Sequence, residues 1–120
     1  MAVDGKERIW PTLQNLEEYL LDTPEHKQRY DLACNYISGL ECADVSCGAG
    51  YGSFMLSSAA KNVIGYDISR QALRHAKQYF QTDKVHFDHV DEFHGKKFDA
   101  IVSFETLEHM DEEQGDSFLA

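Results

Sequence analysis

The segment between residues 43 and 52 most narrowly restricts what this chain can fold into. A short apolar run ends in a carboxylate, Asp44, and glycines then occupy every second position at Gly48, Gly50 and Gly52. The residues after Gly50 have the pattern of a helix, so the order is strand, glycine-rich turn, helix. Because glycine has no side chain, its backbone can approach a ligand closely at a helix start. The segment predicts a nucleotide-like ligand beside the turn.

A second acidic position supports this interpretation and narrows the ligand. Asp67 follows the short apolar segment 63–66, and an acid at the end of the second strand usually binds a ribose hydroxyl pair in such folds. A dinucleotide fingerprint, G-x-G-x-x-G, starting at Gly48 would need its third glycine at position 53, where the chain has Ser53. The spacing therefore argues against a nicotinamide dehydrogenase. Asp44 beneath the turn suits a positively charged ligand instead.

The remaining pattern alternates strands and helices. The expected strands are 43–45, 62–66, 85–90 and 98–104, and the expected helices between them are 51–60 and a segment capped by Ser69 whose apolar face is Ala72, Leu73, Ala76 and Phe80. Such alternation predicts βαβ units, right-handed crossovers and a parallel sheet. We therefore expect an α/β fold, a Rossmann-like parallel sheet with flanking helices. Its ligand should lie at the carboxyl ends of the strands.

Two helices should precede the sheet. The first is a short amphipathic helix built on Leu13, Leu16, Leu20 and Leu21. The second begins after Thr23 as its N-cap, with Pro at the first helical position, and ends at Gly39. Its buried face should consist of Tyr30, Ala33 and Ile37.

These motifs together resemble the class I S-adenosylmethionine-dependent methyltransferases, over roughly four-fifths of the chain. The family's first motif, D-x-G-x-G-x-G, corresponds to Asp44, Ser46, Gly48 and Gly50, with Ser46 in place of the first glycine. The resemblance implies that this turn holds the methionyl part of the cofactor. Because the side chain of Ser46 would lie close to that part, cofactor binding should be weakened.

The resemblance extends to three further segments. In the second motif, Asp67 would hold both ribose hydroxyls and Ile68 would flank the adenine. Asp91 and Glu92 follow the third strand, where relatives place an acid against the adenine amino group. Residues 98–109 are similar to the fourth strand and its following loop, which brings Phe104 to the cofactor.

The helix before the sheet also resembles that of methyltransferases that modify glycans or small molecules. Such a helix covers the cofactor, so Arg29 could meet the cofactor's carboxylate. Equally, Arg29 could be a surface charge and Tyr30 a residue of the core, and the sequence favours neither reading strongly.

The family fold also defines the expected domains. We expect a helical segment at residues 1–40 and a truncated cofactor-binding α/β domain at 41–120, because a fifth strand and an antiparallel pair should follow the fourth strand. The chain would then be the N-terminal half of a longer enzyme, inactive by itself, with an incomplete class I fold. An uncovered fourth strand would invite self-association through its edge.

Catalytic and metal-binding residues are harder to identify. Glu105, Glu108 and His109 have a spacing that some relatives use for a divalent cation, and His109 could act as a general base. A loop that shapes the acceptor pocket explains these residues equally well, so we expect no metal and name no catalytic residue. His86 and His89 should point to opposite faces of a strand, which argues against a zinc site.

Composition restricts the partners. The 120 residues carry a formal net charge of −10, which disfavours broad binding to nucleic acid. No segment approaches the roughly 18 apolar residues of a membrane span, and three cysteines without metal-site spacing indicate free thiols in a reducing compartment, the cytoplasm.

The sequence therefore predicts an S-adenosylmethionine-dependent methyltransferase that acts on oxygen or nitrogen of a small molecule or glycan intermediate. Methyl transfer from a sulfonium mainly requires near-attack positioning, so cofactor residues are easier to identify than catalytic ones. A non-catalytic or degenerate S-adenosylmethionine-binding module is the alternative, because of Ser46 and the missing C-terminal half.

Overall fold

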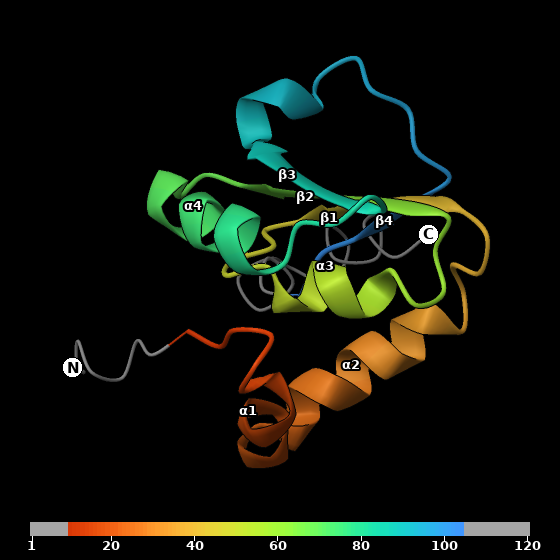
Figure 1. Ribbon diagram of the computed structural model, residues 1–120. Helices are drawn as coiled ribbons and strands as arrows, with labels where there is room; N and C mark the ends of the chain where they lie inside the picture. The colour runs from red at the N-terminus through yellow and green to blue at the C-terminus, as the bar shows by residue number, and fades with distance from the viewer. Residues whose placement is uncertain (1–9, 105–120) are drawn as a thin grey trace.

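A computed structural model describes residues 10–104 of the chain (Figure 1). Its elements are α1 (Leu16–Asp22), α2 (Pro24–Cys34), β1 (Glu41–Val45), α3 (Tyr51–Leu56), β2 (Asn62–Asp67), α4 (Arg70–Tyr79), β3 (Val85–His89), a 3-10 helix (Val90–Phe93) and β4 (Ala100–Val102). The four strands form one sheet in the order β3-β2-β1-β4, and every neighbouring pair is parallel. The predicted α/β fold with a parallel sheet is therefore confirmed.

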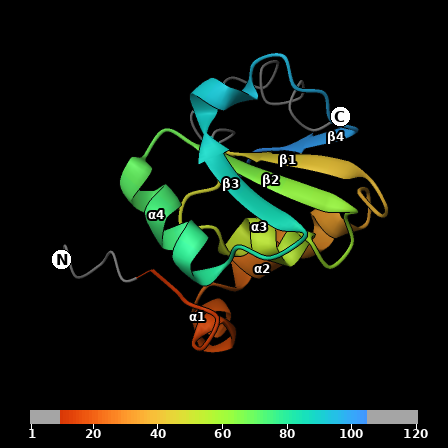
Figure 2. The same ribbon diagram turned by 45° about the horizontal axis from the view of Figure 1, so that its top comes forward.

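The elements are arranged in layers around the sheet. Helices α2, α3 and α4 lie on one side of it, and the 3-10 helix with the loop that follows lies on the other (Figures 1 and 2). Helix α1 lies farther from the sheet, beside α2 (Figure 1). Because the strands are parallel, their carboxyl ends meet at one edge, which places the turn after β1 beside the ends of β2 and β4.

The core between the helices and the sheet has two parts. In one, Tyr30 and Ile37 pack with Leu56 of α3 and with residues of the strands. In the other, the apolar face of α4 packs on β3, and Phe80 is fully buried. Burying a large apolar side chain contributes about 1.5–3 kcal/mol, so these faces hold the helices against the sheet.

The helices before the sheet differ from the prediction. Helix α1 starts at Leu16 and buries none of its residues; the side chain of Leu21 is 77% exposed. Helix α2 ends at Cys34, before Gly39, which adopts a positive φ of 73°. Asn, Ser and Gly between these two positions are weak helix formers, and the early end lets the chain turn toward β1.

The predicted N-caps have different outcomes. Ser69 caps α4 as expected, because its hydroxyl accepts a hydrogen bond from the Ala72 N–H at 3.1 Å. Thr23 precedes α2 but makes no side-chain cap. Its hydroxyl instead donates to the Tyr19 carbonyl at 3.0 Å, because α1 ends there and leaves carbonyl groups that need a donor.

One helix and two strands are shorter than predicted. Helix α3 ends at Leu56, β3 ends at His89, and β4 covers only Ala100–Val102. At Asp99, the residue before β4, the backbone N–H donates to the Glu41 carbonyl at 2.8 Å, whereas the Glu41 N–H donates to the Asp99 side chain at 2.9 Å. Phe98 lies outside the strand, and its ring stacks on the ring of Phe93 with the two centroids 5.9 Å apart.

The described residues also bear on membrane location and on thiol chemistry. Between residues 10 and 104, no helix is long and apolar enough to cross a membrane. Cys34, Cys42 and Cys47 are free thiols.

Cys42 should make the protein sensitive to alkaline pH. Burial, followed by the charges of Asp44 and Cys34, raises the pKa of this thiol from 9.0 to about 12. As pH rises, Cys42 therefore loses its proton in the unfolded chain before it does so in the folded protein. The protonated thiol's contribution to the free energy of unfolding is fully present below pH 9 and is lost by up to about 1.4 kcal/mol per pH unit as pH rises toward 12. Urea midpoints between pH 8 and roughly pH 10.5 should fall less steeply in Cys42→Ala than in the wild type. Parallel slopes would contradict the assignment.

Candidate cofactor site

The turn between β1 and α3 is held over the end of β2. The backbone N–H groups of Ser46 and Cys47 both donate to the Tyr66 carbonyl, at 2.7 and 2.9 Å. Three residues of the turn have positive φ: Ser46 at 68°, Gly48 at 58° and Gly50 at 99°. Only glycine adopts this conformation without strain, so the turn needs glycine for its shape.

The alternating glycines have different roles. A Cβ on Gly50 would lie 2.6 Å from the Ala76 Cβ, and one on Gly52 would lie 2.1 Å from the Tyr30 Cζ. These two glycines therefore allow α4 and α2 to pack against α3. A Cβ on Gly48 would meet no described atom within 4 Å, so Gly48 faces the open side of the turn.

Asp67 joins the two predicted motifs directly. Its Oδ2 accepts a hydrogen bond from the Gly48 N–H at 2.8 Å, and its Oδ1 accepts one from the Ser69 N–H at 2.8 Å. Each carboxylate oxygen can accept a further hydrogen bond, which leaves capacity for a ribose hydroxyl pair. Ile68 beside it is 76% exposed, so an apolar side chain is available to a flat ring.

Asp44 lies beneath the turn and is fully buried. Its Oδ2 accepts a hydrogen bond from the Ser53 hydroxyl at 2.7 Å, which ties the end of β1 to α3. The charge of Asp44 would therefore reach a ligand through the turn and not by direct contact.

A cavity of about 170 Å³ opens beside the glycine turn. Its lining includes three of the predicted cofactor residues, Ser46, Gly48 and Phe104, and the further residues His26, Arg29, Tyr30, Cys47, Ala49 and Tyr51. Arg29 is half-buried in this lining. Tyr30 is 8% exposed and belongs to the core, as predicted.

Sequence reasoning missed the pair formed by His26 and Tyr51. The Tyr51 hydroxyl and the His26 Nδ1 lie 2.6 Å apart in a hydrogen bond between α2 and α3. The two residues are 25 positions apart, and only the packing of two helices brings them together. No spacing in the sequence signals this contact.

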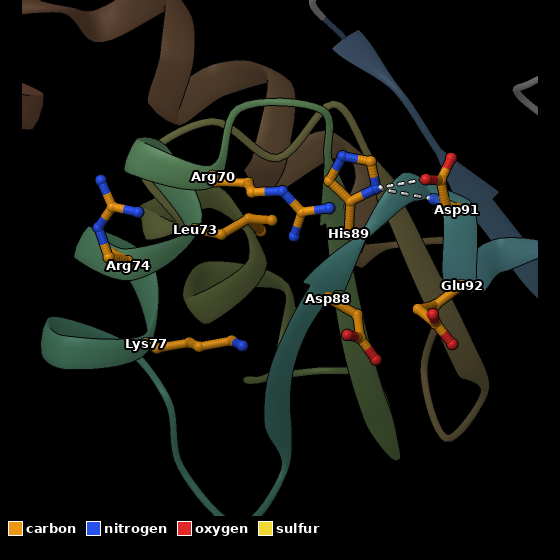
Figure 3. A pocket seen from close by; sticks show the side chains of 8 residues that line it. All are labelled: Arg70, Leu73, Arg74, Lys77, Asp88, His89, Asp91 and Glu92. Carbon is orange, nitrogen blue, oxygen red and sulfur yellow. Dashed lines mark hydrogen bonds and ion pairs between the residues drawn. The ribbon is translucent and has the colours of Figure 1, made fainter.

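Asp91 and Glu92 lie in a second cavity, of about 300 Å³, between α4 and β3 (Figure 3). The His89 Nδ1 accepts a hydrogen bond from the Asp91 N–H at 3.1 Å, which fixes the start of the 3-10 helix. The sheet order places Asp67 and Ile68 between this cavity and the glycine turn. A ligand lying along the ends of β1, β2 and β3 would meet the glycine turn, then Asp67 and Ile68, and then Asp91 and Glu92.

The second cavity has walls of opposite charge. In Figure 3, the side chains of Arg70 and Lys77 extend from α4 toward β3, whereas Arg74 points away. Asp88 and Glu92 lie on the opposite wall, and together with burial, which is the larger cause, they raise the pKa of Tyr66. None of these charged residues lines the cavity at the glycine turn.

Residues considered for a metal fall partly outside the structure. Glu105, Glu108 and His109 lie beyond the described residues. Within residues 10–104, no group of three or more His, Cys, Asp or Glu side chains could hold a metal ion.

Ser46 should lower the stability of the turn. Its φ of 68° is left-handed, which costs a non-glycine residue about 1–2 kcal/mol. Ser46→Gly should therefore raise the free energy of unfolding by about 0.5–1 kcal/mol in urea titrations. Ser38→Gly, at an exposed position without positive φ, should instead lower it. A lower free energy of unfolding in Ser46→Gly would contradict the proposed backbone strain at Ser46.

The chain is similar to known methyltransferases. The methyltransferase domain family matches residues 43–119. A ubiquinone biosynthesis O-methyltransferase from Actinobacillus pleuropneumoniae serotype 7 is 30% identical over 87 residues, 63% of this chain and 37% of the relative. One from Aromatoleum aromaticum is 33% identical over 81 residues, 62% of this chain and 35% of the relative. The chain thus spans little more than a third of these relatives.

Solved structures have the same fold. Magnesium protoporphyrin IX methyltransferase from Synechocystis PCC 6803 with bound SAH matches with a TM-score of 0.61 and 27% identity, over 78% of this chain and 48% of that one. The same enzyme with bound SAM gives a TM-score of 0.65 and 24% identity, over 98% of this chain and 62% of that one. With the matched segment covering more than half of its residues, the chain belongs to the methyltransferase domain family.

Proposed function

We propose that the chain is the cofactor-binding part of an S-adenosylmethionine-dependent methyltransferase. The observation that carries the proposal is that the Asp67 carboxylate bonds the glycine turn at Gly48 and keeps the capacity to accept further hydrogen bonds, as a ribose hydroxyl pair would require. Membership of the methyltransferase family and the Synechocystis enzyme with bound SAH support the choice of cofactor.

Different residues would contact different parts of the cofactor. Asp67 would accept hydrogen bonds from the ribose hydroxyls, and Ile68 would contact the adenine. Asp91 or Glu92 would accept a hydrogen bond from the adenine amino group. These contacts extend the ligand from the end of β2 toward β3.

The other end of the cofactor would occupy the cavity at the glycine turn. Ser46, Gly48 and Gly50 shape the turn around the methionyl part, Asp44 supports it from below, and Arg29 would pair with the carboxylate. The bound cofactor supplies an activated methyl group. The protein's task is then to hold an acceptor in line with it and exclude water.

We propose a small molecule or glycan intermediate, methylated on oxygen or nitrogen, as the acceptor. The ubiquinone and protoporphyrin methyltransferases support a small molecule. The formal net charge of −10 argues against broad nucleic-acid binding.

A non-catalytic S-adenosylmethionine-binding module is the second candidate. The strained Ser46, where the family's motif has glycine, favours it. Binding of the cofactor without methyl transfer to quinol, porphyrin or sugar acceptors would support this candidate over the enzyme.

Calorimetric titration with S-adenosylhomocysteine, S-adenosylmethionine and NAD+ tests the cofactor. Saturable binding of the two sulfur compounds, without binding of NAD+, is the expected result. A preference for NAD+ would overturn the proposal in favour of an oxidoreductase.

The proposal also includes the organisation of the chain. Residues 1–40 would be a helical segment that covers the cofactor-binding domain, 41–120. An apolar groove of about 340 Å³ between α2 and β4, where Leu32 and Tyr36 are 57% and 74% exposed, supports self-association along the β4 edge. The free thiols support a reducing compartment such as the cytoplasm.

A further inference from the structure

Among the residues that the structure describes, the lining of the cavity at the glycine turn includes no acidic side chain. None of the described residues that line it is an aspartate or a glutamate, and Arg29 is its one permanently charged side chain. Asp44 is fully buried beneath the turn. Within the described lining, a positively charged ligand group would therefore be stabilised by something other than direct contact with a carboxylate.

Aromatic rings supply a large part of the lining instead. We define the aromatic wall as Tyr30, Tyr51 and Phe104, which come from α2, the start of α3 and the residues after β4. The rings of Tyr30 and Phe104 meet edge to face with centroids 5.0 Å apart, and those of Tyr30 and Tyr51 are 6.2 Å apart. The faces of aromatic rings carry partial negative charge and attract cations.

The ring of Tyr51 is held in place from two further sides. Its hydroxyl is hydrogen-bonded to the His26 Nδ1 at 2.6 Å, and the His26 ring lies nearly parallel to it at 6.0 Å. The ring of Tyr19 of α1 packs against it in a T-shaped arrangement, with the ring centroids 5.2 Å apart. These contacts fix the ring before a ligand arrives, so little side-chain entropy is lost on binding.

We propose that the aromatic wall, with Tyr51 as its best-fixed ring, binds the sulfonium of the cofactor and makes the protein discriminate by charge. This inference rests on the proposed function. S-adenosylmethionine carries the positive sulfonium, whereas S-adenosylhomocysteine has a neutral thioether at the same position. The wall therefore stabilises the first ligand and adds little to the second.

Tyr51→Leu removes the ring, and its effect on two ligands tests the proposal. A desolvated cation–π contact is worth enough for a loss of about 5- to 30-fold in affinity. Calorimetry should show that loss for S-adenosylmethionine and less than about a threefold change for S-adenosylhomocysteine. Tyr51→Phe, which keeps the ring, should retain the discrimination. Tyr36→Leu, at a tyrosine that is 74% exposed, should change neither affinity.

A third ligand tests whether the discrimination depends on the positive charge or on the methyl group. In sinefungin a carbon that bears an ammonium group replaces the methylated sulfur, so its affinity should fall with that of S-adenosylmethionine in Tyr51→Leu. If sinefungin instead behaves like S-adenosylhomocysteine, or if Tyr51→Leu weakens all three ligands equally, the charge-selective wall is wrong while the cofactor assignment stands. If the folded wild type binds none of the three, the proposed function itself is wrong.

Discussion

Gly50→Ala should destabilise the protein by about 3 kcal/mol or more. The added Cβ would lie 2.6 Å from the Ala76 Cβ and 3.0 Å from the Phe87 Cζ. These atoms belong to α4 and β3, so relief would require α4 to move away from the sheet. The φ of 99° at Gly50 adds backbone strain.

Gly95→Ala is the matched control for this prediction. Gly95 also has a positive φ, of 78°, but a Cβ there would meet no described atom within 4 Å. Its replacement should therefore cost only the backbone term, about 1 kcal/mol. Urea denaturation of both variants separates packing from backbone strain. Equal losses of unfolding free energy in the two variants would contradict the close packing of α4 against the glycine turn.

Asp67→Ala should lower the affinity for S-adenosylhomocysteine by about 100-fold or more. Hydrogen bonds to a charged group contribute about 1.5–3 kcal/mol each, and this side chain would lose those to both ribose hydroxyls. It would also release the Gly48 N–H, which loosens the glycine turn. Calorimetric titration measures the loss.

Two variants make this result specific. Asp67→Asn keeps the size of the side chain and one acceptor oxygen, so it should lose affinity to a smaller degree. Asp83→Ala removes an exposed carboxylate from the turn before β3 and should bind like the wild type. Unchanged affinity in a folded Asp67→Ala would contradict the ribose contact.

Local patterns predicted the parallel sheet and the starts of α2, α3 and α4. The apolar segments 43–45 and 62–66 are short and have an acid within them or directly after them, and the Ser69 side chain caps the helix that follows it. Such signals depend on residues within one or two turns, where side-chain chemistry decides the backbone conformation. The predicted end of α2 was wrong because weak helix formers follow Cys34. The predicted start of β4 was wrong because Asp99 bonds Glu41, a residue far from it in the sequence, through its side chain.

The site was predictable only in part for the same reason. Asp44, Ser46, Gly48 and Asp67 follow from a motif, and the structure adds the hydrogen bond between Gly48 and Asp67 that the motif does not specify. The contact of His26 with Tyr51 depends on how α2 crosses α3, which no local pattern encodes. The strain at Ser46 also becomes visible only as a backbone angle.

Amide chemical shifts titrated with S-adenosylhomocysteine would test the central claim most directly, since they report where the ligand lies. We expect saturable shifts at three separate segments, 46–50, 67–69 and 91–92, at the ends of β1, β2 and β3. Shifts confined to the charged cavity beside Arg70 and Lys77, or to the groove at Leu32 and Tyr36, would contradict the proposed site, as would no shifts in a folded sample.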